Sequence, residues 1–347
     1  MAHHHTLRGR SRPRRPRQGV TLLLVGTLLL AAAAGCGGSQ GASGGGGHRK
    51  VSIGLVTKTE TNPFFVTMRK AAADAAKKNG AELIALAGKF DGDNEGQVDA
   101  VESLIARHVQ GILITPSNTT GILGAIAEAR REGILVIALD TATDPADAVD
   151  ATYATDNLKA GRLQGAYVRA VLVGRPPELI MLDGTEGSSV SRQRHDGFLK
   201  GFGIRNDSPA IRGRANTNGD RNLAQTATEN LLQRTTHVNS AYTINEPVAD
   251  GASAAIAARG LTRQVTIGTI DGGCDGVRAV RAGKYAATVM QFPVRMADDG
   301  VAAVTEFAKS GKKPVGFTDT GTQLITDKPV RGLASRNTDW GLRHCWG

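Results

Sequence analysis

The stretch "VSIGLVTKTETNPFF" (51–65) joins a buried strand to the start of a helix and sets the pattern for the chain that follows. Its first part, "VSIGLV", is mostly apolar and β-branched, which is typical of a strand that is buried on both faces. Asn62 is a good N-cap because its side-chain oxygen can accept an otherwise unpaired backbone N–H, and Pro63 suits the first helical position. The sequence therefore predicts that a strand ends and a helix begins within this stretch.

The two phenylalanines of this stretch are predicted to play different parts. Neighbouring helical residues point about 100° apart, so Phe64 and Phe65 cannot share the core face equally. We expect Phe65, Met68, Ala72 and Ala75 to form the core stripe, which leaves Phe64 near the carboxyl end of the preceding strand. Ligands bind at that end of an open parallel sheet. Phe64 is thus a candidate ligand contact, and local packing at the helix start is the alternative.

The same alternation of strand and helix continues along the chain. Short apolar runs predict further strands over 81–87, 111–116, 134–140, 178–184, 210–215, 240–245, 264–270 and 285–291. Alanine-rich, charged stretches between the first of these predict helices over 64–79, 94–108 and 118–132. This repetition indicates parallel sheets covered by helices on both faces, in two similar α/β halves. We interpret "ATYATDN" (151–157) as a link from the first half to the second.

Composition is that of a globular protein, and the charge lies mostly in a leader. The 347 residues are 40% hydrophobic and 21% charged, which is enough for two domains. The formal charge is +10, but six arginines fall within residues 1–35, and beyond them 36 basic residues face 32 acidic ones. No basic stripe with interleaved aromatic residues follows. The sequence therefore predicts no nucleic-acid partner.

The N-terminal segment is predicted to direct export. An arginine-rich start precedes the apolar run "VTLLLVGTLLLAAAA" (20–34), which is short for a membrane span and typical of a signal peptide over residues 1–35. "AAGC" (33–36) resembles a bacterial lipobox, so we expect lipidation of Cys36; an ordinary signal-peptide cut with an incidental Cys36 is the alternative. Residues 36–49 are rich in glycine and serine, as in a flexible tether. The histidines at 3–5 fall in the removed part, so no metal role is expected.

Polar side chains follow most of the predicted strands, and they suggest a binding site. These residues are Lys58, Asn62, Thr115, Asp140, Asp183, Asn245, Asp271 and Gln291. Turns favour Asn and Asp, which accounts for some of them. In two facing halves, however, they would converge on the crevice between the sheets. Planar carboxylates and amides beside an aromatic ring suit a neutral polyhydroxylated ligand.

Seven motifs in order resemble one protein family over almost all of the chain after the tether. They are "TNPFF", "VIALD", "YATDN", "SVSRQRHDGF", "YTINEPVADGA", "IDGGCDG" and "AATVMQFP". Together they resemble the ribose-binding-type periplasmic proteins of bacterial ABC importers, most closely the fructose-binding branch. The resemblance implies two doubly wound parallel-sheet lobes joined by three crossovers, with no cofactor and no metal. The implied lobes are 50–154 with 292–321, and 155–291 with 322–347.

The resemblance also implies which residues bind the ligand. From the first lobe these are Lys58, Asn62, Phe64, Phe65 and Asp140; from the second Arg192, Asn245 and Asp271; at the crossovers Thr155 and Gln291. Lys58 stands where ribose binders have a small hydroxyl residue, and Thr141 and Ile270 replace an arginine and an aromatic residue of that subgroup. These departures favour a monosaccharide other than ribose. The implied ligand is fructose first, with ribose or mannose as alternatives, delivered by a monomer to the permease of an ABC importer.

Three other functions can be weighed against sugar binding. An enzyme would need a chemical site, but the sequence has no phosphate loop, no dinucleotide fingerprint after a strand and no nucleophile elbow. Asp140 with Asp271 could form an acid–base pair, whereas His195 beside Asp196 lacks a nucleophile. A sugar-responsive repressor would carry a helix-turn-helix where the leader stands. A sensor subunit for a membrane signalling partner stays open as the alternative to transport.

The two remaining cysteines are expected to form a disulfide. Beyond Cys36, the chain has only Cys274 and Cys345, and exported proteins meet an oxidising environment in which paired thiols tend to bridge. The bridge would clip the terminal "HCWG" to the second lobe. The alternative is a pair of free thiols.

Overall fold

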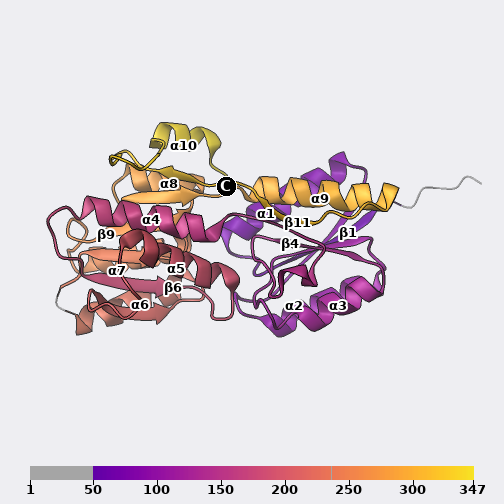
Figure 1. The fold of residues 1–347 in the computed structure, drawn as a ribbon, viewed down its shortest axis with the longest axis horizontal. Coiled ribbons are helices and arrows are strands. Elements are labelled where there is room, and N and C mark those ends of the chain that lie inside the picture. The colour runs from indigo at the N-terminus through magenta and orange to yellow at the C-terminus, as the bar shows by residue number, and fades with distance from the viewer. Residues whose placement is uncertain (1–49, 236) are drawn as a thin grey trace, which may run out of the picture. The chain divides into compact units, whose positions relative to one another are not determined.

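The computed structural model describes residues 50–235 and 237–347, which form two α/β lobes (Figure 1). The predicted signal peptide, Cys36 and the whole tether (36–49) lie outside the described residues. The elements of the first lobe are β1 (Ser52–Thr57), α1 (Pro63–Lys78), β2 (Glu82–Ala87), α2 (Asn94–Ala106), β3 (Gly111–Ile114), α3 (Leu123–Arg131), β4 (Leu135–Leu139), the 3-10 turn η1 (Ala146–Ala148), β5 (Ala151–Ala154), α9 (Pro293–Ser310) and β11 (Gly316–Asp319).

The first lobe is a parallel sheet between two layers of helices. Its strand order is β2-β1-β3-β4-β5-β11, and every neighbouring pair is parallel. Helices α1 and α9 cover one face, and α2 and α3 cover the other. Strands β3 and β4 are buried along their whole length, as continuous apolar runs predict for a parallel sheet covered on both sides.

The second lobe repeats this arrangement with one antiparallel edge. Its sheet has the order β7-β6-β8-β9-β10-β12, in which β12 runs antiparallel to β10. Its elements are α4 (Asn157–Val171), β6 (Leu179–Asp183), α5 (Ser189–Phe202), β7 (Ile211–Asn216), α6 (Arg221–Arg234), β8 (Ser240–Thr243), α7 (Glu246–Ala258), β9 (Thr266–Asp271), α8 (Cys274–Arg281), β10 (Ala287–Met290), β12 (Gln323–Ile325) and α10 (Thr338–His344).

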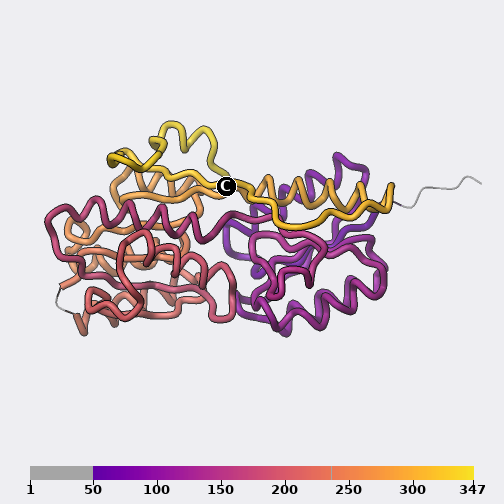
Figure 2. Tube along the Cα trace, viewed as in Figure 1, coloured from indigo at the N-terminus to yellow at the C-terminus, as the bar shows by residue number. Residues whose placement is uncertain are grey.

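The chain passes between the two sheets three times, after β5, after β10 and after β11, as the trace in Figure 2 shows. The predicted fold class of two parallel-sheet α/β lobes is confirmed. Because the carboxyl ends of both sheets face the junction, polar residues at strand ends from both lobes can meet there. None of the helices in the described part of the chain is long and apolar enough to span a bilayer.

Two details of the sequence-based prediction were wrong. Residues 151–154, interpreted as part of a link, form strand β5, because Ala151 and Tyr153 are buried in the first-lobe core. The helix predicted from residue 118 begins at Leu123. Asn118 accepts hydrogen bonds from the backbone N–H groups of Thr120 and Gly121, and this local turn competes with a helix start.

The C-terminal segment ends at the junction between the lobes, where the C-terminus is marked in Figure 1. Helix α10 packs against α8 of the second lobe. In the structure, Cys274 at the start of α8 is bonded to Cys345, with their Cα atoms 4.9 Å apart. The separation lies within the range that disulfides require.

Candidate functional site

A pocket lies between the lobes at the carboxyl ends of both sheets. Eight of the residues predicted to bind the ligand line it: Lys58, Asn62, Phe64, Phe65, Asp140, Asn245, Asp271 and Gln291. Thr155 lies behind the wall rather than in it, and its hydroxyl donates to Gln291 Oε1 over 3.1 Å. The structure therefore brings together most of the predicted set.

Arg192 is the prediction that the structure corrects. Its side chain is 61% exposed outside this pocket, and its nearest acid is Asp144 at 3.9 Å. The arginine in the pocket is Arg194, which is 3% exposed. Residues two apart on a helix point about 200° apart, so α5 turns one arginine to solvent and the other inward. A signal was present: Arg194 shares the i, i+4 stripe with Val190 and Phe198 of "SVSRQRHDGF".

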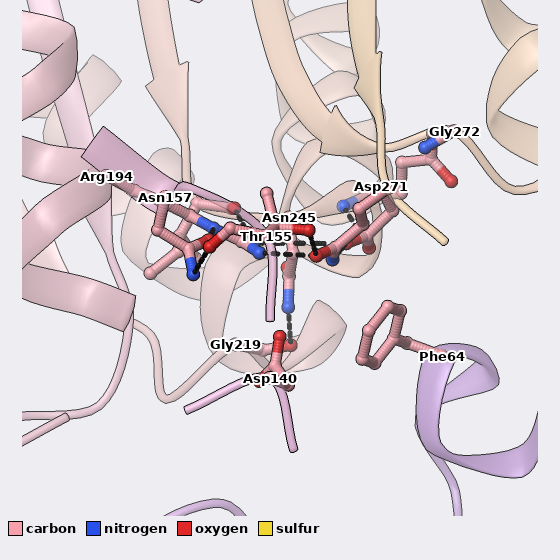
Figure 3. Close-up of polar contacts among 12 residues, drawn as sticks. Phe64, Asp140, Thr155, Asn157, Arg194, Gly219, Asn245, Asp271 and Gly272 are labelled. Atoms are coloured by element: carbon pink, nitrogen blue, oxygen red, sulfur yellow. Dashed lines mark hydrogen bonds and ion pairs between the residues drawn. The ribbon is translucent and has the colours of Figure 1, made fainter. Parts of the chain in front are cut away.

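Arg194 is held by second-lobe residues on several sides (Figure 3). Its Nε donates to Asn157 Oδ1 over 2.7 Å, and Nη1 donates to the carbonyl oxygen of Ile244 over 2.9 Å. Nη2 donates to Gln291 Oε1 over 3.1 Å, and Nη1 lies 3.9 Å from Asp271 Oδ1. These contacts fix the guanidinium plane before any ligand arrives, and a planar fork suits paired oxygens.

Asp271 ends strand β9 and joins the same network. Gln291 Nε2 donates to Asp271 Oδ1 over 2.8 Å, and the backbone N–H of Glu246 donates to Oδ2 over 3.2 Å. Burial raises the pKa of Asp271 to about 6, and Arg194 opposes this rise. Its carboxyl group is therefore mostly ionised at pH 7 and able to accept hydrogen bonds.

Glu246 lies beneath Asp271 and braces the turn that follows it. One carboxyl oxygen of Glu246 accepts from the Gly272 N–H over 2.9 Å and from the Thr288 hydroxyl over 2.7 Å, and the other accepts from the Gly273 N–H over 3.2 Å. Burial, with the neighbouring Asp271, raises the pKa of Glu246 well above its usual value. Of these two neighbouring carboxyl groups, Asp271 lines the pocket and Glu246 does not. Glu246 was not among the residues predicted from the sequence.

The two site aspartates have unusual backbone conformations. Asp140 has φ 62° and Asp271 has φ 151°, both in the positive region that residues other than glycine rarely adopt. Asp140 is 5% exposed, and its Oδ2 accepts from the Thr141 hydroxyl over 2.9 Å. Such conformations persist where the surroundings hold them, and they cluster at functional sites. Here they aim carboxylates from β4 and β9 into one pocket.

The helix starts supply the amides and the aromatic wall. Asn62 caps α1 by accepting from the Phe64 N–H over 3.0 Å, as the sequence predicts. Asn245 caps α7 by accepting from the Val248 N–H over 3.0 Å. Each cap uses the side-chain oxygen and leaves the amide nitrogen for other partners; in Asn245 it donates to the Gly219 carbonyl oxygen over 3.2 Å. Phe64 projects from α1 toward Asp271 in Figure 3.

One end of the pocket is formed by the predicted residue Lys58 together with Asp91, which was not predicted. Lys58 is 3% exposed, and its Nζ lies 3.8 Å from Asp91 Oδ2 and 3.4 Å from the Ser188 hydroxyl. Asp91 Oδ1 and the Thr185 hydroxyl are buried without a partner among the described residues. Burial raises the pKa of Asp91, and the positive charge of Lys58 opposes this rise. Asp91 follows β2, so the rule that polar residues follow strands could have found it.

The lobes touch each other beside the pocket. The Thr119 N–H of the first lobe donates to the Gly187 carbonyl oxygen over 2.9 Å, and the Ser189 N–H donates back to the Thr119 hydroxyl over 2.8 Å. The Ser189 hydroxyl donates to the Ala142 carbonyl oxygen over 2.9 Å. These bonds hold the two walls close together, which is a closed arrangement.

The histidine that was considered for catalysis lies away from the pocket. His195 pairs with Asp183 over 2.7 Å outside this pocket, and the hydrogen bond with Asp183 raises the His195 pKa. Within residues 50–235 and 237–347, no cluster of three or more acidic, histidine or cysteine side chains could hold a metal ion.

Comparisons with known proteins agree on one family. The model of the family described as "Periplasmic binding protein domain" matches residues 53–313. The chain is 32% identical to the ribose import binding protein of Haemophilus influenzae over 75% of this chain and 87% of the relative. It is 28% identical to the D-allose-binding periplasmic protein of Escherichia coli, covering 74% and 85%. A solved ABC transporter solute binding protein from Mycobacterium smegmatis, with bound glycerol, matches with TM-score 0.73 and 27% identity over 80% of this chain and 94% of that one.

Proposed function

The chain belongs to the periplasmic binding protein family, a family of binding proteins rather than enzymes, and on this premise we propose that it captures a monosaccharide outside the cytoplasm for an ABC importer. One observation carries the proposal: Asp140 and Phe64 from one lobe face Arg194, Asn245 and Asp271 from the other across a single pocket. Both walls come from one chain, so the protein would act as a monomer.

The charges of the pocket favour a neutral sugar over an anionic ligand. Two cations, Lys58 and Arg194, face the carboxyl groups of Asp91, Asp140 and Asp271. A ligand carrying its own negative charge would add repulsion to a set that is already balanced or slightly negative. Sugar hydroxyl groups can donate to the carboxylates and accept from the cations, while an aromatic ring covers an apolar face.

Fructose is our first candidate ligand, with ribose and mannose as alternatives. Relatives are named for binding ribose and allose, which supports a monosaccharide without choosing among them. The polar end formed by Lys58 and Asp91 offers partners for one more exocyclic hydroxyl group, which supports a hexose. We assign 50–154 with 292–321 to one closing lobe and 155–291 with 322–347 to the other, and closure would present the loaded sugar to the permease.

A panel of sugars tests the function. Thermal melting of the parent protein with fructose, ribose, mannose and allose at about a thousandfold excess over Kd should show stabilisation of about 4 kcal/mol for a true ligand. Because the ligand contacts both lobes, small-angle scattering should show compaction with the same sugar. Glucuronate serves as the charged control and should have no effect. A protein that melts at one temperature with every sugar contradicts the proposal.

We also propose that the exported protein is anchored by lipid on Cys36, without another membrane segment. The support is the lipobox-like "AAGC" and the glycine-rich tether that follows it. Thioether-linked lipid holds a globular body near a membrane without inserting it. Mass spectrometry of the mature N-terminal peptide should find diacylglyceryl on Cys36, and Cys36→Ala should release the protein from membranes. An unmodified peptide that begins at another residue contradicts the anchor.

A further inference from the structure

The penultimate residue, Trp346, contacts three parts of the candidate site from behind. Its indole Nε1 donates to the backbone carbonyl oxygen of Gln291 over 2.9 Å. Its ring meets the ring of Phe64 edge-on, with centroids 5.5 Å apart. Its own carbonyl oxygen accepts from the Cys274 N–H over 2.9 Å, in the turn that follows Asp271. The side chain is buried, so these contacts are shielded from water.

Trp346 also connects the two lobes. Its ring belongs to the hydrophobic core of the first lobe, together with Phe64 and Phe65 of α1. Its backbone is paired with Gly273 of the second lobe. A Cβ atom on Gly273 would lie 3.4 Å from the indole, so the turn approaches the ring closely. One residue thus spans the junction at which the lobes must bend.

The bond between Cys274 and Cys345 keeps this residue in place. Cys345 immediately precedes Trp346, and Cys274 begins α8. The bridge therefore holds Trp346 against the second-lobe turn at Gly273.

We propose that Trp346 is a positioning residue for the sugar site and that the Cys274–Cys345 bridge holds it there. The inference rests on the proposed function. Phe64 needs a rigid support to present its ring to a sugar, and the indole edge supplies it. Gln291 needs a fixed backbone, because its side chain connects Arg194 to Asp271. Removing the indole lets both supports relax and weakens binding without removing any group that touches the sugar.

Substitutions of the two tryptophans test the proposal. The chain has only Trp340 and Trp346, and Trp340 stacks on His344 of α10, so Trp340→Phe is a matched control. In calorimetric titration with the sugar found in the panel, Trp346→Phe should bind about three- to tenfold more weakly, the cost of one lost hydrogen bond. Trp346→Ala should bind more weakly still. Trp340→Phe should keep the affinity of the parent.

The Trp340→Phe protein allows a second measurement, the fluorescence of Trp346. A purely structural role of Trp346 would not make this fluorescence respond to sugar. Its single remaining tryptophan should shift in emission when sugar binds, because the indole lies between the two lobes and its surroundings change on closure. The Trp346→Phe protein, with Trp340 alone, should show no shift.

Reduction tests the part played by the bridge. Dithiothreitol would convert the disulfide to two thiols and itself become a cyclic disulfide. We expect the reduced parent to bind about tenfold more weakly, and the Cys274→Ser/Cys345→Ser protein to bind equally weakly with no response to dithiothreitol. If Trp346→Phe and the reduced parent both bind like the oxidised parent, the proposal is overturned. Because every comparison starts from a parent that binds, failure of the sugar panel is a separate result that rejects the proposed function instead.

Discussion

Replacing Arg194 with methionine should weaken sugar binding more than about a hundredfold. The guanidinium is buried, and its hydrogen bonds to Asn157, Ile244 and Gln291 hold the second-lobe wall together. Its loss also leaves Asp271 without its neighbouring cation. Removing one partner of a buried ion pair destabilises the folded protein by about 3–5 kcal/mol. Methionine keeps an unbranched apolar stem and removes the guanidinium group, with its charge and its hydrogen bonds.

Arg192→Met is the matched control for this prediction. Arg192 lies on the same helix, but its side chain is exposed, and its contact with Asp144 at 3.9 Å is of the surface kind that is worth little. Calorimetric titration should find its affinity within about twofold of the parent, because exposed pairs contribute about 0–1 kcal/mol. Circular dichroism and melting curves check that both variants fold. If Arg194→Met binds the sugar as tightly as Arg192→Met, then Arg194 is not part of the sugar site.

Replacing Asp271 with asparagine should weaken binding by about tenfold to a hundredfold, since hydrogen bonds to charged groups contribute about 1.5–3 kcal/mol each. The amide keeps the shape of the side chain and loses its charge. Asp275→Asn serves as the control, because Asp275 follows four residues later and its side chain is 96% exposed. Titration of both variants against the same sugar measures the difference. Equal affinities for both variants would show that Asp271 does not accept from the ligand.

The pH dependence of the parent provides a second test of Asp271. As pH rises, the sugar affinity and the free energy of unfolding should change in opposite directions. Burial raises the pKa of Asp271 to about 6, so affinity should fall about tenfold from pH 7 to pH 5 as the carboxylate is protonated. Between the ordinary value of 3.8 and about 6, the folded protein binds more protons than the unfolded chain. The free energy of unfolding without sugar should therefore fall as pH rises through that window.

The Asp271→Asn protein should lose this part of both pH profiles. The Asp271 charge also raises the pKa of its neighbour Glu246, so the difference in stability between the two proteins reports the Asp271–Glu246 pair together. An affinity in the parent that stays constant from pH 7 to pH 5 contradicts an ionised Asp271 as a ligand acceptor.

The sequence by itself determined the strand–helix alternation, the two lobes and most of the pocket. These features depend on neighbours in the chain: Asn62 caps its own helix, Asp140 follows its own strand and Asp271 ends its own strand. Local chemistry suffices wherever a residue's role is set within one turn or one strand. The parallel order of the strands then brings their carboxyl ends together at one edge of each sheet, with β12 as the antiparallel exception.

Only the tertiary structure decided which arginine enters the pocket and what supports it. The stripe of Val190, Arg194 and Phe198 marks Arg194 as the inward arginine of α5, but only the packed structure shows that this stripe borders the pocket. Glu246 and Trp346 act through groups 26 and 55 residues away, at Gly272 and Gln291. Burial raises the pKa of Asp271, and burial is a property of the assembled lobes rather than of any segment. Pattern and spacing report contacts along the chain, whereas these contacts exist only after distant segments have packed together.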